Sequence, residues 1–436
     1  MKLIIRGGRI IDPASGRDEP GSVAVASGRI VALGNEPAGF AADRVIDAQG
    51  CLILPGLIDL AARLREPGHE HVGLLESEMA AAVAGGVTAL VCPPDTDPVL
   101  DEPGLVEMLR YRAERLHQAR VFPLGALTKG LAGEALTEMV HLAEAGCVGF
   151  GQADQAMANT QVLLRALQYA STFGYTVWLR PQDAYLGSGV AASGSLATRM
   201  GLPGVPVAAE TIALHTIFEL VRATGARVHL CRLSSAAGVE LVRAARAQGL
   251  AVTADVSVHS LHLTDLDIGY FDSHARLSPP LRQARDRAAL RAALADGTLT
   301  ALVSDHNPVG SDAKALPFGQ AEPGATAIEL LASLAHKWAL DEGIPTTRAW
   351  ATLTSHPADI LASSMGSLQA SLGRLVEGGV ADVCVFDPQA AWVVTAEGLR
   401  SHGKHTPFQG YELPGRVRAT LVGGHVAFER AVDRTA

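Results

Sequence analysis

The middle of the chain alternates amphipathic segments with short runs that are apolar at nearly every position. In each repeat a helical pattern ends at a glycine and an apolar, β-rich run begins within three residues; these glycines are Gly86, Gly146, Gly174, Gly225, Gly249 and Gly297. Glycine just past a helix adopts the left-handed conformation that closes the last turn. Continuously apolar runs are typical of parallel strands buried on both faces. The pattern therefore predicts a helix–strand repeat.

Two further runs, Leu57–Leu64 and Arg120–Leu127, bring the expected strands to eight. Eight strands that alternate with helices over roughly 300 residues predict an α/β protein with a (β/α)8 TIM-type barrel, which we place at residues 53–364. An open, doubly wound sheet is the alternative that uses the same elements, and the strand count favours the barrel.

The two ends of the chain have a different pattern. Residues 1–52 and 365–436 contain short alternating runs separated by turns that contain glycine. Such runs predict hairpins. Because these segments flank the barrel, we expect them to pair into one small β-domain built from both ends.

Composition narrows the class of protein. Of the 436 residues, 48% are apolar and 19% charged, which provides a large core and excludes a disordered chain. The net charge of −9 argues against a nucleic-acid binder. The first residues lack a signal peptide, and the longest uncharged stretch is too short to span a membrane. We expect a cytoplasmic protein whose five scattered cysteines are free thiols: Cys51, Cys92, Cys147, Cys231 and Cys384.

Several motifs share one resemblance that runs along nearly the whole chain. They are PGLIDLAARLREPG (55–68), PPDTDPVLD (93–101), LSPPLRQARDRAAL (277–290) and SDHNPV (304–309). Together they resemble the dihydroorotase branch of the cyclic amidohydrolases, whose first strand ends D-x-H-x-H-x-R-x-P-G. The resemblance implies a metal-dependent hydrolase that holds one or two Zn²⁺ ions with the H-x-H pair, a carboxylated lysine or aspartate, two further histidines and a final aspartate. Hydrolysis of a ring amide at neutral pH needs a metal-bound hydroxide and a Lewis acid on the carbonyl.

This sequence departs from the family at nearly every ligand position. The replacements are Ala61 and Arg63 at the H-x-H pair, Gln152 and Ala153 at the acidic positions after the fourth strand, and Arg180 and Arg232 at the two later histidines. Only Asp305 is retained. Arginine stays protonated and cannot ligate a cation, and one carboxylate cannot hold a catalytic zinc. We therefore expect no metal, no cofactor and no catalytic residue.

Positions that contact substrate in the family have changed in part. Arg65 matches the arginine that meets the substrate carboxylate, and His259 matches the first histidine of the P-H-H-L run. Asp95 replaces an asparagine, and its negative charge would repel an anionic substrate. Ser260 and Ser278 replace a histidine and an asparagine of the family pattern.

Two interpretations of the three arginines remain open. In one interpretation the arginines are neutral substitutions whose guanidinium groups point to solvent. In the other, the side chains of Arg63, Arg180 and Arg232 converge in the former metal cavity. Convergence would be costly without acidic partners such as Asp95 or Asp154, water, or a bound anion. Asp305 is either a residual metal ligand or, as we favour, a buried carboxylate held by a neighbouring arginine.

The remaining histidines are expected to be structural. Strand alternation places His229 on the face opposite to Arg232, as a packed core residue. His69 and His71 follow the first strand, and we expect surface or capping roles for them. His306 follows Asp305 and corresponds to a family histidine that does not ligate the metal.

These observations support three hypotheses. The first is a non-catalytic dihydroorotase homologue that assembles with the catalytic chain of aspartate carbamoyltransferase in pyrimidine biosynthesis; this partner is implied by the resemblance alone. The second is an active cyclic amidohydrolase with an atypical site built from His69, His71, His259 and Asp305. The third is an anion sensor that uses the arginine-lined cavity. Barrels of this composition often dimerise, so we also expect a homodimer.

Overall fold

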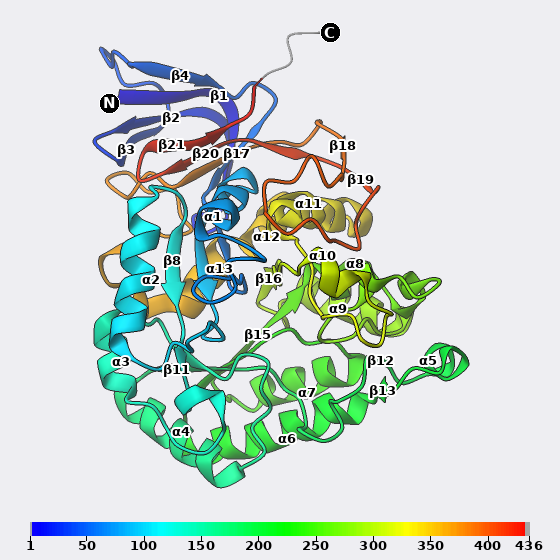
Figure 1. Ribbon diagram of the computed structural model, residues 1–436. Helices are drawn as coiled ribbons and strands as arrows, with labels where there is room; N and C mark the ends of the chain where they lie inside the picture. Colours follow the sequence, from blue (N-terminus) through cyan, green and yellow to red (C-terminus); the bar gives the residue numbers. More distant parts are fainter. Residues whose placement is uncertain (1, 432–436) are drawn as a thin grey trace.

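The computed structural model describes residues 2–431, and its centre is a closed parallel barrel (Figure 1). The barrel strands are β6 (Leu57–Asp59), β7 (Val87–Cys92), β8 (Arg120–Pro123) continued by β9 (Gly125–Ala126), β10 (Phe150–Gly151), β11 (Thr176–Leu179), β14 (Arg227–Leu230), β15 (Val252–Ser257) and β16 (Ala301–Val303). A parallel bridge between Ala62 and His306 joins the first and last strands. The (β/α)8 barrel is thus confirmed, and the open sheet is wrong.

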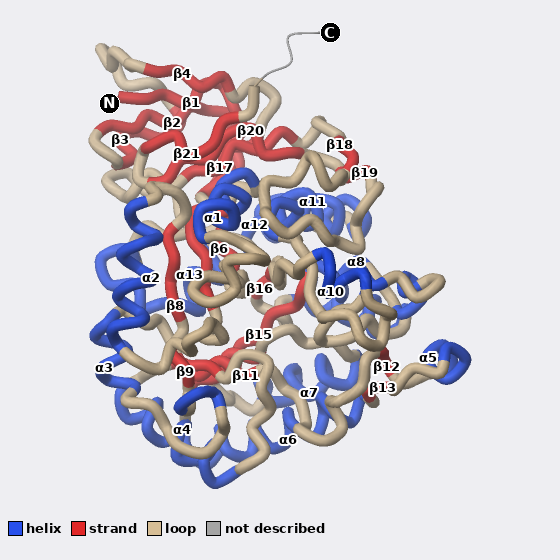
Figure 2. Tube along the Cα trace, viewed as in Figure 1, coloured by secondary structure: helices blue, strands red, loops and turns tan. Residues whose placement is uncertain are grey.

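Helices surround these strands (Figure 2). They are α1 (Leu75–Ala84), α2 (Pro103–Arg115), α3 (Met139–Ala145), α4 (Thr160–Phe173), α6 (Val207–Thr224), α7 (Ala236–Ala247), α9 (Ala284–Asp296), α11 (Leu331–Glu342), α12 (Thr346–Ala351) and α13 (Ser355–Leu361). Gly174 and Gly297 end α4 and α9 in the left-handed conformation that the sequence predicts. Within residues 2–431, no helix has both the length and the apolar character needed to cross a bilayer.

Short elements occupy the loops at the carboxyl ends of the strands. They are α5 (Ser195–Met200), which extends away from the barrel between β12 (Ala191–Ala192) and β13 (Gly204–Val205), α8 (Val258–His262), α10 (Ser311–Ala315) and the 3₁₀ turns at Asp265–Ile268 and Ser273–Ala275. Functional residues of a TIM barrel lie on this face.

Both ends of the chain contribute to one eight-stranded sheet. Its strands are β1 (Lys2–Asp12), β2 (Arg17–Ala26), β3 (Arg29–Gly34), β4 (Arg44–Asp47), β5 (Leu52–Pro55), β17 (Val383–Asp387), β20 (Arg416–Val422) and β21 (His425–Glu429). The antiparallel pairing of β5 with β17 joins the two ends. A separate hairpin pairs β18 (Trp392–Val393) with β19 (Glu412–Leu413).

The barrel interior is a compact apolar core. Ile58, Val91, Trp178 and Val303 belong to one buried cluster, which α13 extends at the amino ends of the strands through Leu361. Bulky aliphatic and aromatic side chains fill this end, so the space for chemistry is confined to the carboxyl ends of the strands.

The first strand is shorter than the sequence predicts. β6 ends at Asp59, although the apolar run continues to Leu64. The Asp59 carboxylate accepts hydrogen bonds from the amides of Ala61 (3.2 Å) and Ser304 (3.1 Å). This local turn ends the ladder and directs the following residues into the mouth of the barrel.

Candidate functional site

Six charged side chains meet at the carboxyl ends of the barrel strands. This arginine–aspartate cluster consists of Arg63, Arg180, Arg232, Asp95, Asp154 and Asp305. Asp154 is its centre, because its carboxylate accepts from Arg63 Nη2 (3.0 Å), Arg180 Nη1 (3.2 Å) and Arg232 Nη2. The second interpretation of the arginines, convergence on acidic partners, is the arrangement found.

The other two aspartates complete the network. Arg63 Nε donates to Asp95 (2.8 Å), and Arg232 Nη1 donates to Asp305 (3.0 Å). The three arginine side chains are only 5–8% exposed. Three guanidiniums face three carboxylates, so the formal charges balance within the cluster. A buried ion pair stabilises a protein only when its charges are compensated in this way.

Electrostatics favour the charged forms at the centre of the cluster, whereas burial prevails at its edges, where it raises the pKa of Asp305 and lowers the pKa of Arg180. Burial acts to raise the pKa of Asp154, but Arg232, Arg63 and Arg180 outweigh it and hold that pKa well below its usual range. Burial acts to lower the pKa of Arg63, yet Asp95 and Asp154 keep it above the ordinary value. Asp154 therefore remains ionised, and Arg63 remains charged at any pH at which the protein is folded.

Non-glycine residues with positive φ surround the cluster. They are Arg65 (φ 62°), Ala153 (φ 50°), Arg232 (φ 57°) and Asp305 (φ 50°). Three of them stand two residues past a barrel strand, where the chain turns sharply at the mouth, and Arg65 lies farther along the loop after β6. Left-handed backbone at a residue with a Cβ costs roughly 1 kcal/mol, and such strain concentrates at functional sites. The mouth of the barrel therefore carries four strained backbone positions close to the arginine–aspartate cluster.

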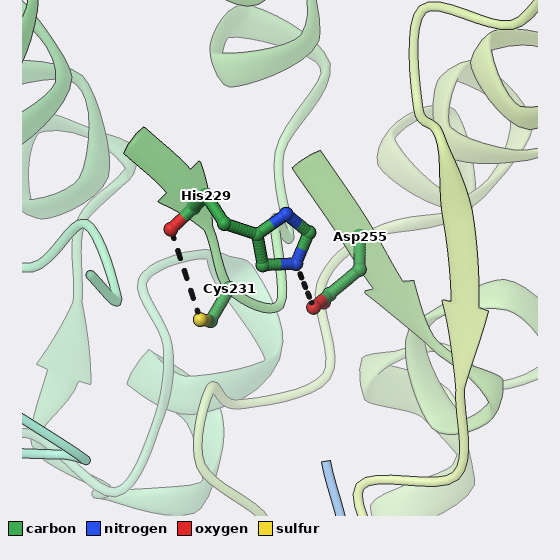
Figure 3. Close-up of side chains that lie close together, drawn as sticks. All are labelled: His229, Cys231 and Asp255. Atoms are coloured by element: carbon green, nitrogen blue, oxygen red, sulfur yellow. Dashed lines mark hydrogen bonds and ion pairs between the residues drawn. The ribbon is translucent and has the colours of Figure 1, made fainter. Parts of the chain in front are cut away.

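Asp255 links the backbone of Arg232 to the ring of His229, and Figure 3 draws this aspartate beside His229. Its Oδ1 accepts from the Arg232 amide (2.6 Å), and its Oδ2 lies 2.9 Å from His229 Nε2. The other ring nitrogen of His229 lies 2.8 Å from Thr253 Oγ1. Sequence reasoning gave Asp255 no role, because its partners lie on a neighbouring strand.

His229, Cys231 and Asp255 are the one group of three potential metal-ligating side chains in the described part of the chain, with donor atoms within 4.8 Å of one another. Both nitrogens of His229 already have partners, and burial raises the pKa of Cys231 well above its usual value. Figure 3 shows the imidazole directed at Asp255. This group is therefore a hydrogen-bonded part of the core.

The packed position of His229 was predicted, but the reason given for it is wrong. The side chain is fully buried against Trp178. Arg232 lies beyond the end of β14 with a φ of 57°, so the alternation of strand side chains does not extend to it. The relative faces of the two residues cannot be obtained by counting along the strand.

A second buried network lies beside the first strand. His306 Nε2 lies 2.8 Å from Glu78 Oε2, and the Ala327 amide donates to His306 Nδ1 (3.2 Å). Because Nδ1 accepts, the ring proton is on Nε2 and is donated to Glu78. Ser401 Oγ also donates to Glu78 (2.6 Å). His306 therefore connects Glu78 of α1 to the Ala327 backbone, and Glu78 in turn holds Ser401.

Arg65 is also held by other groups of the protein. Its Nε donates to the Pro308 carbonyl (2.7 Å), and its Nη2 lies 3.5 Å from Glu322. Burial lowers its pKa, and its side chain is 10% exposed.

Gln152 turns away from the cluster, since its amide donates to Thr128 Oγ1 (2.8 Å) and the Leu131 carbonyl (2.8 Å).

The four residues of the atypical metal site do not come together. His259 is 2% exposed and stacks on Phe408, and both of its ring nitrogens lack partners. Burial lowers its pKa to about 3. His69 and His71 lie near each other on the surface loop after the first strand. None of these four side chains belongs to a group of three potential ligands within residues 2–431.

Cavities border the cluster. The largest of them, of about 120 Å³, includes Arg180 in its lining together with Leu179, Gln182 and Tyr185. A smaller cavity of about 30 Å³ is lined by Leu60, Ala61, Pro93, Trp178 and Cys231 together with Arg63 and Arg232. That volume is about what one or two water molecules need. Ala61 and Ala153 have no ligand atom, and Asp305 is engaged by Arg232. The residues present therefore do not fit a catalytic zinc ion, which takes three protein ligands and an open position.

Comparison with known proteins agrees with this fold and these motifs. A family model described as "Dihydro-orotase-like" matches residues 50–237. A "Dihydroorotase-like protein" from Pseudomonas putida is 45% identical over 427 residues, which cover 98% of this chain and 99% of the relative. The chain belongs to the dihydroorotase-like family.

Other relatives and solved structures extend the comparison. A protein of the same description from Pseudomonas aeruginosa is 44% identical and a "Dihydroorotase" from Syntrophotalea carbinolica is 37% identical; each covers 98% of this chain, and the matches cover 100% and 99% of the relatives. The L-hydantoinase (dihydropyrimidinase) of Arthrobacter aurescens has a TM-score of 0.87 at 21% identity, covering 97% of this chain and 95% of that one. The last likeness shows the fold of this dihydroorotase-like chain and nothing about its chemistry.

Proposed function

We propose that this dihydroorotase-like protein is a pseudoenzyme of pyrimidine biosynthesis, a structural subunit that assembles with the catalytic chain of aspartate carbamoyltransferase. The observation that carries the first half of this proposal is the closed arginine–aspartate cluster. Its guanidiniums occupy the positions at which the family has histidine ligands, and its charges are balanced without a metal ion.

The chemistry of the cluster supports loss of hydrolysis. A guanidinium cannot bind a water molecule as a Lewis acid and lower its pKa, which is the metal's part in ring-amide hydrolysis. Arg65, the counterpart of the family's substrate-binding arginine, is engaged by Pro308 and Glu322. Asp95 adds a negative charge where an anionic substrate would bind. Both changes weaken binding of an anionic substrate, in addition to the loss of the metal ligands.

The intact fold supports a role that depends on surfaces. The barrel, its helices and the sheet shared by both chain ends are complete, and the relatives match along their full length. A chain without chemistry that remains well packed acts through binding. The transcarbamoylase is the partner implied by the family resemblance.

Co-purification tests the assembly. The chain and the aspartate carbamoyltransferase catalytic chain of the same organism are mixed at micromolar concentration and examined by size-exclusion chromatography with light scattering. We expect one complex of defined stoichiometry. Two separate peaks at these concentrations would contradict the assembly.

An active dihydroorotase is the second candidate, and the relatives named "Dihydroorotase" at 36–37% identity favour it. Zinc-loaded protein is assayed for dihydroorotate and hydantoin turnover, and its zinc is counted by elemental analysis. Stoichiometric zinc together with turnover would favour the enzyme and overturn the pseudoenzyme. Neither is expected from the cluster geometry.

The anion sensor has less support. Every guanidinium in the cluster contacts a carboxylate, so little attraction remains for an added anion. A thermal shift of the folded protein in carbamoyl phosphate, carbamoyl aspartate or nucleotides would favour this function, because a ligand that binds only the folded state stabilises it.

A further inference from the structure

The loop between α8 and α9 exposes an apolar tip at the mouth of the barrel. The tip is defined by Leu266, Tyr270 and Phe271, which are 67%, 97% and 41% exposed. The rings of Tyr270 and Phe271 meet edge to face, with centroids 6.0 Å apart. Single exposed apolar residues are ordinary on protein surfaces, but three within six positions of one loop form a patch.

The tip is held on a rigid base. Ile268 and Ala275 anchor the loop in the core, at 2% and 3% exposure. The Asp272 amide donates to the Ile268 carbonyl (2.8 Å), which closes the turn that carries both aromatic rings. Phe271 has a φ of 62°, a conformation that a bulky residue adopts only where its surroundings impose it. The backbone that carries both rings is therefore held in one conformation, which reduces the entropy lost on binding.

The surroundings of the tip are acidic. Asp272 has a 51% exposed side chain that contacts His274, and the 48% exposed Glu322 contacts Arg65. The exposed Asp312 lies on the adjoining loop after β16. The nearby Lys314 does not offset them at the surface, because its Nζ is buried and donates to the carbonyls of Ser273 (3.0 Å) and Arg276 (3.1 Å). The bound surface should therefore carry positive charge around an apolar centre.

We propose that Leu266, Tyr270 and Phe271 are the docking tip through which this chain binds the transcarbamoylase catalytic chain, on a surface that offers an apolar cleft rimmed by lysine or arginine. This inference rests on the assembly proposed above. It names the part of this chain that the assembly uses. Tyrosine and rigid aromatic anchors dominate the binding energy of protein interfaces.

The test compares variants in a quantitative binding assay with the purified transcarbamoylase chain. Tyr270→Ser and the double variant Tyr270→Ser/Phe271→Ser are measured beside Tyr111→Ser, a control in which a tyrosine that is 60% exposed on α2 receives the same change. Loss of an interface hot spot should raise the Kd at least about tenfold for Tyr270→Ser and further for the double variant. The control should stay within about twofold.

Folding is checked separately. Tyr270 is 97% exposed, so Tyr270→Ser leaves the thermal midpoint unchanged, and any loss of binding by that variant is a loss of the contact itself. The charge argument is tested with Asp312→Asn, which should slow association at low salt and leave the dissociation rate nearly unchanged.

The outcomes separate this inference from the proposed function. If the parent chain does not bind the transcarbamoylase, the assembly is wrong and the docking tip is wrong with it. If the parent binds and both tip variants bind as tightly as Tyr111→Ser, the assembly stands and the docking tip is overturned. If the parent and Tyr111→Ser bind tightly and only the tip variants bind weakly, the assembly and the docking tip are both supported.

Discussion

Arg63 Nη2 lies 3.0 Å from Asp154 Oδ2, and this contact joins the chain that follows the first barrel strand to the chain that follows the fourth. Asp154 is 30% exposed, whereas Arg63 is 7% exposed, so the central carboxylate still reaches solvent while the guanidinium is buried. The pair links two strand ends across the mouth of the barrel.

Removing the central carboxylate should destabilise the fold. Asp154→Asn leaves three buried guanidiniums with two carboxylates, and breaking a buried ion pair in this way costs about 3 kcal/mol. Urea unfolding measures the loss. The same variant should gain more stability from phosphate than the parent does, because an added anion can replace the missing charge.

Glu114→Gln is the matched control, since Glu114 is 71% exposed and pairs with Arg110 on the surface of α2. Its free energy of unfolding should change by no more than about 0.5 kcal/mol. An Asp154→Asn variant as stable as this control would show that the cluster contributes nothing to stability.

Restoring histidines should restore metal binding. A variant with Ala61→His, Arg63→His, Arg180→His and Arg232→His supplies four imidazoles beside Asp305 and removes the three guanidiniums. We expect it to retain close to one zinc ion per chain after dialysis, as counted by elemental analysis, and to lose thermal stability when a chelator is added.

The parent chain, loaded and dialysed in the same way, is the control. Its cluster should retain no stoichiometric zinc, because arginine offers no lone pair. Equal zinc in parent and variant would mean that other residues bind it, and the interpretation of the cluster as a replaced metal site would fail.

Asp59 should give the protein a measurable pH dependence. Burial raises the pKa of this carboxyl from its ordinary 3.8 to about 6. A folded-state pKa above the unfolded value favours folding most at pH below about 4, and this contribution is lost as the pH rises to 6 and beyond. A shift of about two units corresponds to about 3 kcal/mol.

Asp59→Asn removes this titration and retains the shape of the group. The amide oxygen can still accept from Ala61 and Ser304. The stability of the variant relative to the parent should therefore rise by up to about 3 kcal/mol between pH 4 and pH 7. A stability difference that does not change with pH would contradict the raised pKa of Asp59.

Gly68 should be intolerant of a side chain. Its φ is 97°, and a Cβ at this position would lie 2.2 Å from the Asp97 carbonyl oxygen. Gly68→Ala would push the loop that carries Arg65 away from the loop that carries Asp95, at a cost of about 2–4 kcal/mol. Chemical denaturation measures the free energy of unfolding of Gly68→Ala. Gly104→Ala on α2 is the control, since a Cβ at Gly104 meets nothing within 4 Å. Equal stability of the two would show that the loops move apart freely.

Much of the fold can be obtained from the sequence, because parallel strands and their helices leave local signals. The glycines that end α4 and α9 are where the pattern predicts them. The end of β6 was missed, because the Asp59 carboxylate stops the strand by accepting the amide of Ser304, which is far along the chain. Glu78 was also missed, since its partners His306 and Ser401 come from distant elements.

The sequence by itself determined the barrel, the family resemblance and the identity of each replaced ligand, because these depend on residue type and on spacing along the chain. Only the tertiary structure decided between two fates for the arginines. From the sequence alone, their long side chains could extend into solvent or converge on a shared carboxylate equally well. The common target is Asp154, which the fold carries to within hydrogen-bonding distance of all three guanidiniums. Contacts among ends of different strands are set by how the barrel closes, and no local pattern records them.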